Sequence, residues 1–121
     1  MKIPGSDHPI SIAPNSSRVR VMLGGKVLAD TRRALTMRET SLPPVHYIPR
    51  EDVDIALLTR TAHATHCPFK GDASYFTVQA NGRTAENAAW SYEQPFPAVS
   101  AIAERLAFYP ERVDRIEELP A

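Results

Sequence analysis

The feature that most constrains the fold of this chain is the dipeptide Asn81-Gly82. It separates two runs, residues 73–80 and 83–92, in which apolar and polar side chains alternate. Asn-Gly between alternating runs is the strongest short-range indication of a two-residue β-hairpin loop, because both loop residues must adopt positive φ. Alternation with a period of two places apolar side chains on one face of a strand. The sequence therefore predicts an antiparallel β-hairpin here.

A two-residue loop also predicts the register of this hairpin. Val78 would face Ala85, and Phe76 would face Asn87. The face expected to lie against the core carries Phe76, Val78, Ala80, Ala85 and Ala89. Asn87 is the one amide on this face, so we expect it to be buried and hydrogen-bonded at both ends of its side chain.

A second glycine turn predicts a second hairpin. Gly24-Gly25 separates residues 18–23 from residues 26–31, and glycine adopts positive φ without steric cost. Eleven prolines among 121 residues, about twice the usual share of ~5%, argue against long helices. Pro97 to Leu106 has apolar residues at helical spacing. These features predict a mainly β fold of compact antiparallel sheets with one short helix.

The length of 121 residues favours a single domain with one core. We expect residues 1–121 to form that domain, with the core at about 8–114. We expect residues 1–14 to be loosely ordered and flexible, apart from any docking of Ile10 and Ile12. In the tail, Val113, Ile116 and Leu119 stand among charged residues and predict a last helical turn.

Charge and cysteine content narrow the function classes. Fourteen basic and fourteen acidic residues give no net field that would attract nucleic acid. No run approaches the ~18 apolar residues of a membrane span, so we expect a cytoplasmic protein with neither nucleic-acid nor membrane partners. The single cysteine excludes an internal disulfide and the usual structural zinc site, and we expect no metal and no cofactor. The oligomeric state is not indicated by the sequence.

The densest chemistry surrounds the single cysteine. Cys67 follows His66 and precedes Lys70, and both neighbours could stabilise a reactive thiolate. These three residues are the candidate catalytic groups of an enzyme that uses Cys67 as a nucleophile or redox centre. The alternative is that Cys67 is a small buried apolar residue, because a catalytic thiol also needs a positioned base and an oxyanion site.

Aromatic residues with polar tips form the second candidate group. Such side chains bind planar or cationic ligands by stacking and hydrogen bonding, and most small-molecule pockets are apolar with a few fixed polar groups. The residues that we expect to line a ligand pocket are Tyr47, Cys67, Lys70, Tyr75, Trp90 and Tyr92. The alternative is that Trp90 covers a small core.

Three blocks of sequence carry a family resemblance. They are Thr65 to Tyr75, with Cys67-Pro68 and Lys70-Gly71, then Asn87 to Glu93, and Ala107 to Pro110. With Tyr47-Ile48-Pro49 before them, they resemble the bacterial domain-of-unknown-function family 427, also labelled nucleotidyltransferase-like, over roughly residues 8–114. The resemblance implies a β-tent fold, like methionine sulfoxide reductase B and the thalidomide-binding domain of cereblon. Relatives of that architecture often carry a four-cysteine zinc site, which this chain cannot build.

The nucleotidyltransferase label requires residues that the chain does not supply. Such enzymes use a Gly-Ser turn to hold phosphates and paired acidic residues to hold two metal ions. Asp52-Val53-Asp54 provides the acidic residues, but no Gly-Ser turn precedes it at a suitable distance. We therefore expect no nucleotidyl transfer.

Three hypotheses follow from the sequence. The leading one is a module that binds a small molecule or a peptide in the aromatic pocket. The second is the Cys67 enzyme, and the third is a structural subunit of a larger assembly.

Overall fold

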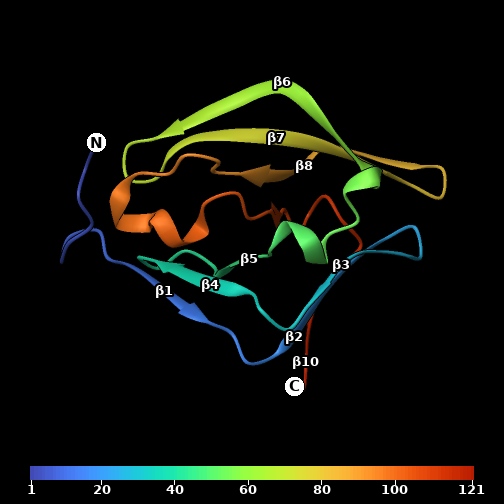
Figure 1. The fold of residues 1–121 in the computed structure, drawn as a ribbon, viewed down its shortest axis with the longest axis horizontal. Helices are drawn as coiled ribbons and strands as arrows, with labels where there is room; N and C mark the ends of the chain where they lie inside the picture. The colour runs from blue at the N-terminus through green and yellow to red at the C-terminus, as the bar shows by residue number, and fades with distance from the viewer.

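The structure, a computed structural model that describes residues 1–121, consists of three antiparallel sheets (Figure 1). The first contains β1 (Ile10–Pro14), β4 (Leu35–Glu39) and β5 (Val45–Tyr47). The second contains β10 (Arg115–Leu119), β2 (Arg18–Leu23) and β3 (Lys26–Thr31). The third contains β6 (Leu58–Cys67), β7 (Gly71–Ala80), β8 (Arg83–Ser91) and β9 (Ala107–Phe108). The predicted mainly β class is confirmed.

The helical content consists of three short 3-10 helices: η1 (Arg50–Asp52), η2 (Ile55–Leu57) and η3 (Pro97–Ile102). The predicted helix after Pro97 is therefore present but shorter and of a tighter type. It is kinked at Val99, whose φ and ψ are not helical. Val99 and Ile102 are buried, as their helical spacing predicts.

Both predicted hairpins are confirmed. β2 pairs with β3 around Gly24-Gly25, and β7 pairs with β8 around Asn81-Gly82. Their two turns touch, since the Asn81 side-chain amide donates a hydrogen bond to the carbonyl oxygen of Gly24 at 2.8 Å. The second and third sheets are thus tied together at their hairpin turns.

The predicted register of the second hairpin holds near the turn and fails beyond it. Val78 pairs with Ala85, but Phe76 pairs with Ala89 instead of Asn87 because β8 bulges between them. A shift of two residues keeps every side chain on its face. All five residues of the predicted core face are consequently buried.

Asn87 occupies the bulge, so the expectation for its side chain was wrong. The residue has a φ of 49° and is only half-buried. Its side-chain oxygen accepts a hydrogen bond from the Thr61 hydroxyl at 2.6 Å, while its backbone N–H donates to Thr77 Oγ1. Asparagine is one of the few residues that adopt this conformation readily.

Both ends of the chain differ from the expectation. Ile10 and Ile12 do dock, but the ordered part extends over all of residues 10–14, because β1 pairs with β4 along its whole length. The tail forms β10 rather than a helical turn, and Ile116 lies opposite Val21 of β2. The free edge of β2 provides a partner that local apolar spacing does not reveal.

The four-stranded sheet packs against both other sheets (Figure 1). It shares a large apolar cluster with β2 and β3, in which Val19, Leu28 and Val78 are fully buried. A smaller cluster joins it to β4, β5 and η3; its members are Met37, Tyr47, Ala73, Tyr75, Tyr92, Val99, Ile102 and Ala107. No helix has the length and apolar character needed to cross a membrane.

Candidate ligand-binding site

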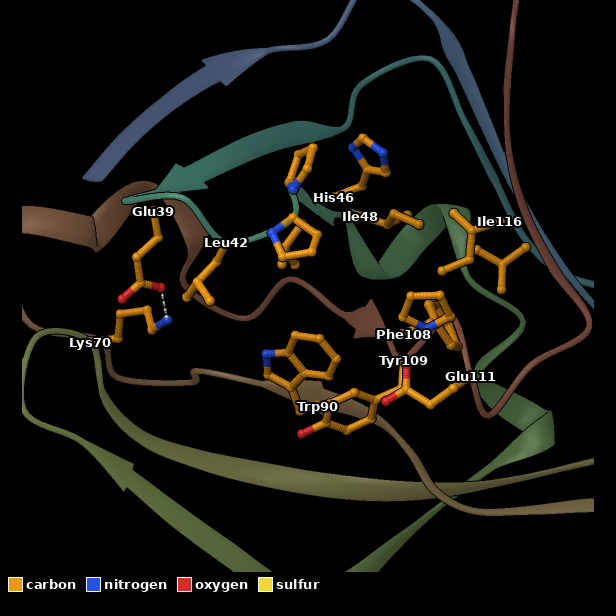
Figure 2. A pocket seen from close by; sticks show the side chains of 15 residues that line it. Glu39, Leu42, His46, Ile48, Lys70, Trp90, Phe108, Tyr109, Glu111 and Ile116 are labelled. Atoms are coloured by element: carbon orange, nitrogen blue, oxygen red, sulfur yellow. Dashed lines mark hydrogen bonds and ion pairs between the residues drawn. The ribbon is translucent and has the colours of Figure 1, made fainter. Parts of the chain in front are cut away.

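A cavity of about 510 Å³ lies where the three sheets meet, between the loop before β5 and the β8–β9 edge (Figure 2). Its lining comes from all three sheets. The lining residues are Val21, Glu39, Leu42, Pro43, Pro44, Val45, His46, Ile48, Lys70, Trp90, Phe108, Tyr109, Pro110, Glu111 and Ile116.

Aromatic rings and a proline-containing loop both line the cavity. Leu42 lies on one side, with Trp90 and Tyr109 opposite (Figure 2), and Pro43-Pro44 follow Leu42 in the lining. The two prolines lack backbone N–H groups and have fixed φ, which favours an exposed loop at this point over a longer β5 strand. The proline-containing side of the cavity is therefore rigid.

Trp90 and Tyr109 are held in place by contacts with each other and with neighbouring side chains. The Trp90 and Tyr109 ring centroids are 4.4 Å apart, with 39° between their planes. Trp90 Nε1 donates a weak hydrogen bond to the Tyr47 hydroxyl at 3.4 Å. Arg112 lies over the Tyr109 ring, with its guanidinium carbon 4.4 Å from the centroid. These contacts leave Trp90 and Tyr109 half-buried at the surface of the cavity.

An ion pair closes one end of the cavity. Lys70 Nζ donates to Glu39 Oε1 at 2.5 Å, and His8 Nε2 donates to Glu39 Oε2 at 2.7 Å. Burial alone would raise the pKa of Glu39, but the hydrogen bonds from Lys70 and His8 outweigh it and hold the pKa below its usual value. The Lys70 and Glu39 side chains are only 14% and 11% exposed, so the pair is a nearly buried one.

The opposite end carries Glu111, Ile116 and His46. His46 Nδ1 shares a hydrogen bond with Thr36 Oγ1 at 2.8 Å, and burial lowers the pKa of its ring. The imidazole is thus neutral at pH 7. Burial also raises the pKa of Tyr109 to about 12, so its phenol stays protonated.

The six predicted pocket residues fall into two groups. Lys70 and Trp90 line the cavity. Tyr47, Tyr75 and Tyr92 are buried in the smaller apolar cluster, and Cys67 packs against that cluster. Burial raises the pKa values of the Tyr47 and Tyr92 hydroxyls. These three tyrosines do not line the cavity, but Tyr47 and Tyr75 hydrogen-bond to Trp90 and Tyr109, which do.

Sequence reasoning missed Glu39, Tyr109 and the Pro43-Pro44 loop as cavity residues. Pro43-Pro44 and the segment Phe108 to Pro110 are visible as breaks in the strand pattern, which is typical of cavity rims. Nothing in the sequence indicates the pairing of Glu39 with Lys70, because the two residues are 31 positions apart.

The candidate catalytic residues do not converge on the sulfur. Cys67 Sγ forms no hydrogen bond, and the residue is half-buried at the end of β6. Lys70 is engaged with Glu39, and His66 Nδ1 is paired with Asp72 Oδ1 at 2.7 Å. The thiol therefore has neither a hydrogen-bonded base nor a bonded cation beside it.

Of the acidic residues Asp52 and Asp54, only Asp52 forms side-chain hydrogen bonds. Asp52 accepts hydrogen bonds from the Thr31 hydroxyl at 2.7 Å and from Arg33 at 3.2 Å. Asp54 is exposed before η2. No three His, Cys, Asp or Glu side chains come together in a way that could hold a metal ion.

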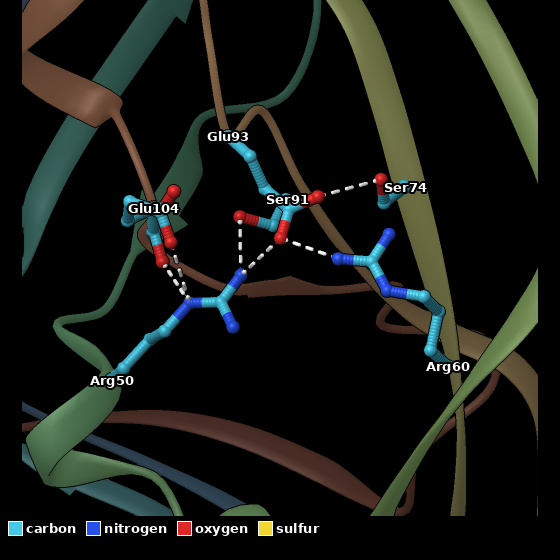
Figure 3. A network of polar contacts seen from close by, with 6 residues as sticks. All are labelled: Arg50, Arg60, Ser74, Ser91, Glu93 and Glu104. Atoms are coloured by element: carbon cyan, nitrogen blue, oxygen red, sulfur yellow. Dashed lines mark hydrogen bonds and ion pairs between the residues drawn. The ribbon is translucent and has the colours of Figure 1, made fainter.

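A second polar cluster lies beside the core, where Arg50 and Arg60 approach Glu93 from two sides (Figure 3). Arg60 donates to Glu93 Oε2 at 2.5 Å, Arg50 donates to the same oxygen at 3.3 Å, and the Ser74 hydroxyl donates to Oε1. The hydrogen bond from Arg60 is the main reason why the pKa of Glu93 is lowered. The cluster joins η1, β6 and β7 to the segment after β8, a structural role that satisfies Glu93 fully.

Comparison with known proteins decides the family. The family model described as Domain of unknown function (DUF427) matches residues 11–119. The chain belongs to the DUF427 family. The match runs from β1 to the last residue of β10, so the DUF427 domain includes all three sheets and the whole cavity. The search of the curated proteins gave no match.

Proposed function

We propose that this DUF427 domain binds a small organic molecule in the cavity between Pro43-Pro44 and Trp90. The observation that carries the proposal is the cavity itself: about 510 Å³, mostly apolar, with an ion pair fixed at one end. Small-molecule sites are typically concave spaces of ~300–1,000 Å³ with an apolar lining and a few fixed polar groups. This volume fits a small molecule of one or two rings.

The stiffness of the walls supports the same proposal. Tyr47 and Tyr75 hydrogen-bond to Trp90 and Tyr109, Arg112 lies over the Tyr109 ring, and two prolines contribute to the rest of the lining. A ligand that enters such a site orders few protein side chains, and less binding free energy is lost to conformational entropy.

We further propose that the three sheets form a β-tent. Support comes from the packing of the four-stranded sheet over two three-stranded sheets, with the cavity beneath the line where they meet. Superposition on a methionine sulfoxide reductase B domain tests this, and strands that align in the same spatial order are the expected result.

The experiment for the binding function begins with native mass spectrometry of freshly purified protein, which reveals any retained molecule. Trp90 is the single tryptophan, so its fluorescence reports on the cavity directly during titration with a library of small aromatic compounds. Val45→Phe narrows the cavity and should abolish the fluorescence change. Ile55→Phe adds the same ring at an exposed position outside the lining and should leave it intact. Equal responses from the two variants would contradict the proposal.

The alternative, an enzyme that uses Cys67, has no observation in its favour beyond the residue itself. The thiol lacks a hydrogen-bonded base, and Lys70 is held by Glu39. A slow reaction of the native thiol with alkylating reagents is the expected consequence.

A further inference from the structure

The charged end of the cavity has unused hydrogen-bond donors on Lys70. Each oxygen of Glu39 already accepts one charge-assisted or ring N–H hydrogen bond, from Lys70 and from His8. A lysine ammonium has three N–H donors, and Lys70 Nζ uses one of them on Glu39. It forms no other hydrogen bond, and its other charge contact is with the face of the Tyr92 ring, whose centroid lies 5.8 Å away.

Because Lys70 has unused N–H donors beside a mostly apolar cavity, it favours a ligand that carries a hydrogen-bond acceptor. A ligand ammonium would meet Lys70, a like charge, and a carboxylate whose charge Lys70 already compensates. A ligand carboxylate would accept a charge-assisted hydrogen bond from Lys70, and such bonds are roughly twice as strong as those between neutral groups. Because most of the remaining lining is apolar, water competes weakly for this ammonium.

The other parts of the cavity define the rest of the ligand. Trp90 and Tyr109 lie across the cavity from Leu42 (Figure 2), and Pro43-Pro44 follow Leu42 in the lining, so the space between the two sides suits a flat aromatic body. Glu111 lies at the end opposite Lys70, where its negative charge disfavours a second anionic group.

We propose that the ligand is an aromatic monocarboxylic acid, with its carboxylate on Lys70 and its ring between Pro43-Pro44 and Trp90. This inference rests on the proposed binding function and specifies its ligand class.

The experiment compares three probes of one shape on the unmodified protein by isothermal titration calorimetry. The probes are 2-naphthylacetic acid, 2-naphthylacetamide and 2-(2-naphthyl)ethylamine at pH 7.5. The acid should bind at least 10-fold more tightly than the amide, and the amine should bind more weakly than both. An acid that binds no more tightly than the amide overturns the inference, and this comparison needs no variant protein.

Two variants test the role of Lys70. Lys70→Met keeps the length of the side chain and removes the charge, so the preference for the acid over the amide should disappear. Lys70→Met alone leaves Glu39 without its ammonium partner. The double variant Glu39→Gln/Lys70→Met removes both charges and should likewise bind the acid and the amide equally. Lys26→Met, at an exposed lysine of the first hairpin outside the lining, should retain the 10-fold preference. A preference that persists in the double variant also overturns the inference.

The outcomes separate this inference from the proposed function. If acid and amide bind equally and Val45→Phe abolishes both, the inference fails while the binding function stands. If no probe binds, the inference fails, and the binding function fails with it only where native mass spectrometry also finds no retained molecule.

Discussion

At the scale of single residues, the Glu39–Lys70 ion pair is short and nearly buried, so both charged groups are poorly hydrated. A buried ion pair adds little net stability, but removal of one partner leaves the other charge uncompensated. Glu39 is the residue on which Lys70 and His8 converge, so it holds β4, the turn after β6 and the segment before β1 in one arrangement.

Glu39→Gln should therefore lower the free energy of unfolding by about 3 kcal/mol, the lower end of the range for a broken buried pair. The matched control is Glu51→Gln, which removes a carboxylate from the exposed pair with Arg33, where the side chains are 66% and 58% exposed. That substitution should cost less than about 1 kcal/mol. Urea unfolding of both variants measures the difference, and equal losses would show that Lys70 is as well solvated as Arg33.

Cys67 tests the alternative function at the same scale. The sulfur is half-buried and hydrogen-bonded to nothing, so we expect slow alkylation by iodoacetamide in the native protein at pH 7 and fast alkylation in urea. Cys67→Ser should leave the fluorescence response of Trp90 to ligand unchanged. Rapid alkylation of the native protein below pH 7 would favour the enzyme hypothesis.

At the scale of elements, the two hairpins depend on one glycine more than on the others. Gly24 has a φ of 59°, and a Cβ atom there would lie 2.9 Å from the carbonyl oxygen of Ala80 in the other hairpin. Gly25 has a φ of 76°, but a Cβ atom there would have no other atom within 4 Å. The first position combines backbone strain with a clash between sheets, whereas the second has strain alone.

Gly24→Ala should accordingly destabilise the domain by about 2–3 kcal/mol, and Gly25→Ala by about 1 kcal/mol, the cost of a non-glycine residue at positive φ. Thermal unfolding followed by circular dichroism measures both. A larger loss for Gly25→Ala would mean that the two turns do not touch in solution.

At the scale of the whole molecule, stability should fall in acid through two sets of groups. Hydrogen bonds from Arg18, Arg60 and Lys70 hold the pKa values of Asp30, Glu93 and Glu39 below their usual range. A carboxyl whose pKa is lower in the folded state contributes stability above the unfolded pKa near 4 and loses it as the pH falls through the folded pKa. Burial lowers the pKa of His46, so the unfolded state binds its proton first as the pH drops below about 6.5.

We predict a gradual loss of stability below about pH 6.5 and a steeper loss below about pH 4. His46→Gln should remove the first phase and leave the second. Urea midpoints measured from pH 3 to pH 8 check both phases. Midpoints that are flat between pH 5 and pH 7 in the unmodified protein would contradict the assignment to His46.

The sequence by itself determined the elements whose cause is local. Asn81-Gly82 and Gly24-Gly25 specify hairpins because the turn requires positive φ at those positions, and alternation then assigns the buried face. The family blocks and the spacing of prolines also predicted the fold class, because these signals can be read from short stretches of sequence. Trp90 and Lys70 were found as site candidates from their chemistry alone.

Only the tertiary structure decided the features that depend on distant partners. The bulge at Asn87 is held by Thr61 and Thr77, and β10 becomes a strand because β2 offers it a free edge. The cavity brings Pro43-Pro44, Trp90 and Glu111 together from three separate segments, and the Glu39–Lys70 pair that closes it spans 31 positions. Burial of the tyrosines follows from the same packing of sheets. Alternation along a strand decides on which face of the sheet a side chain lies, but the segments that cover that face come from elsewhere in the sequence.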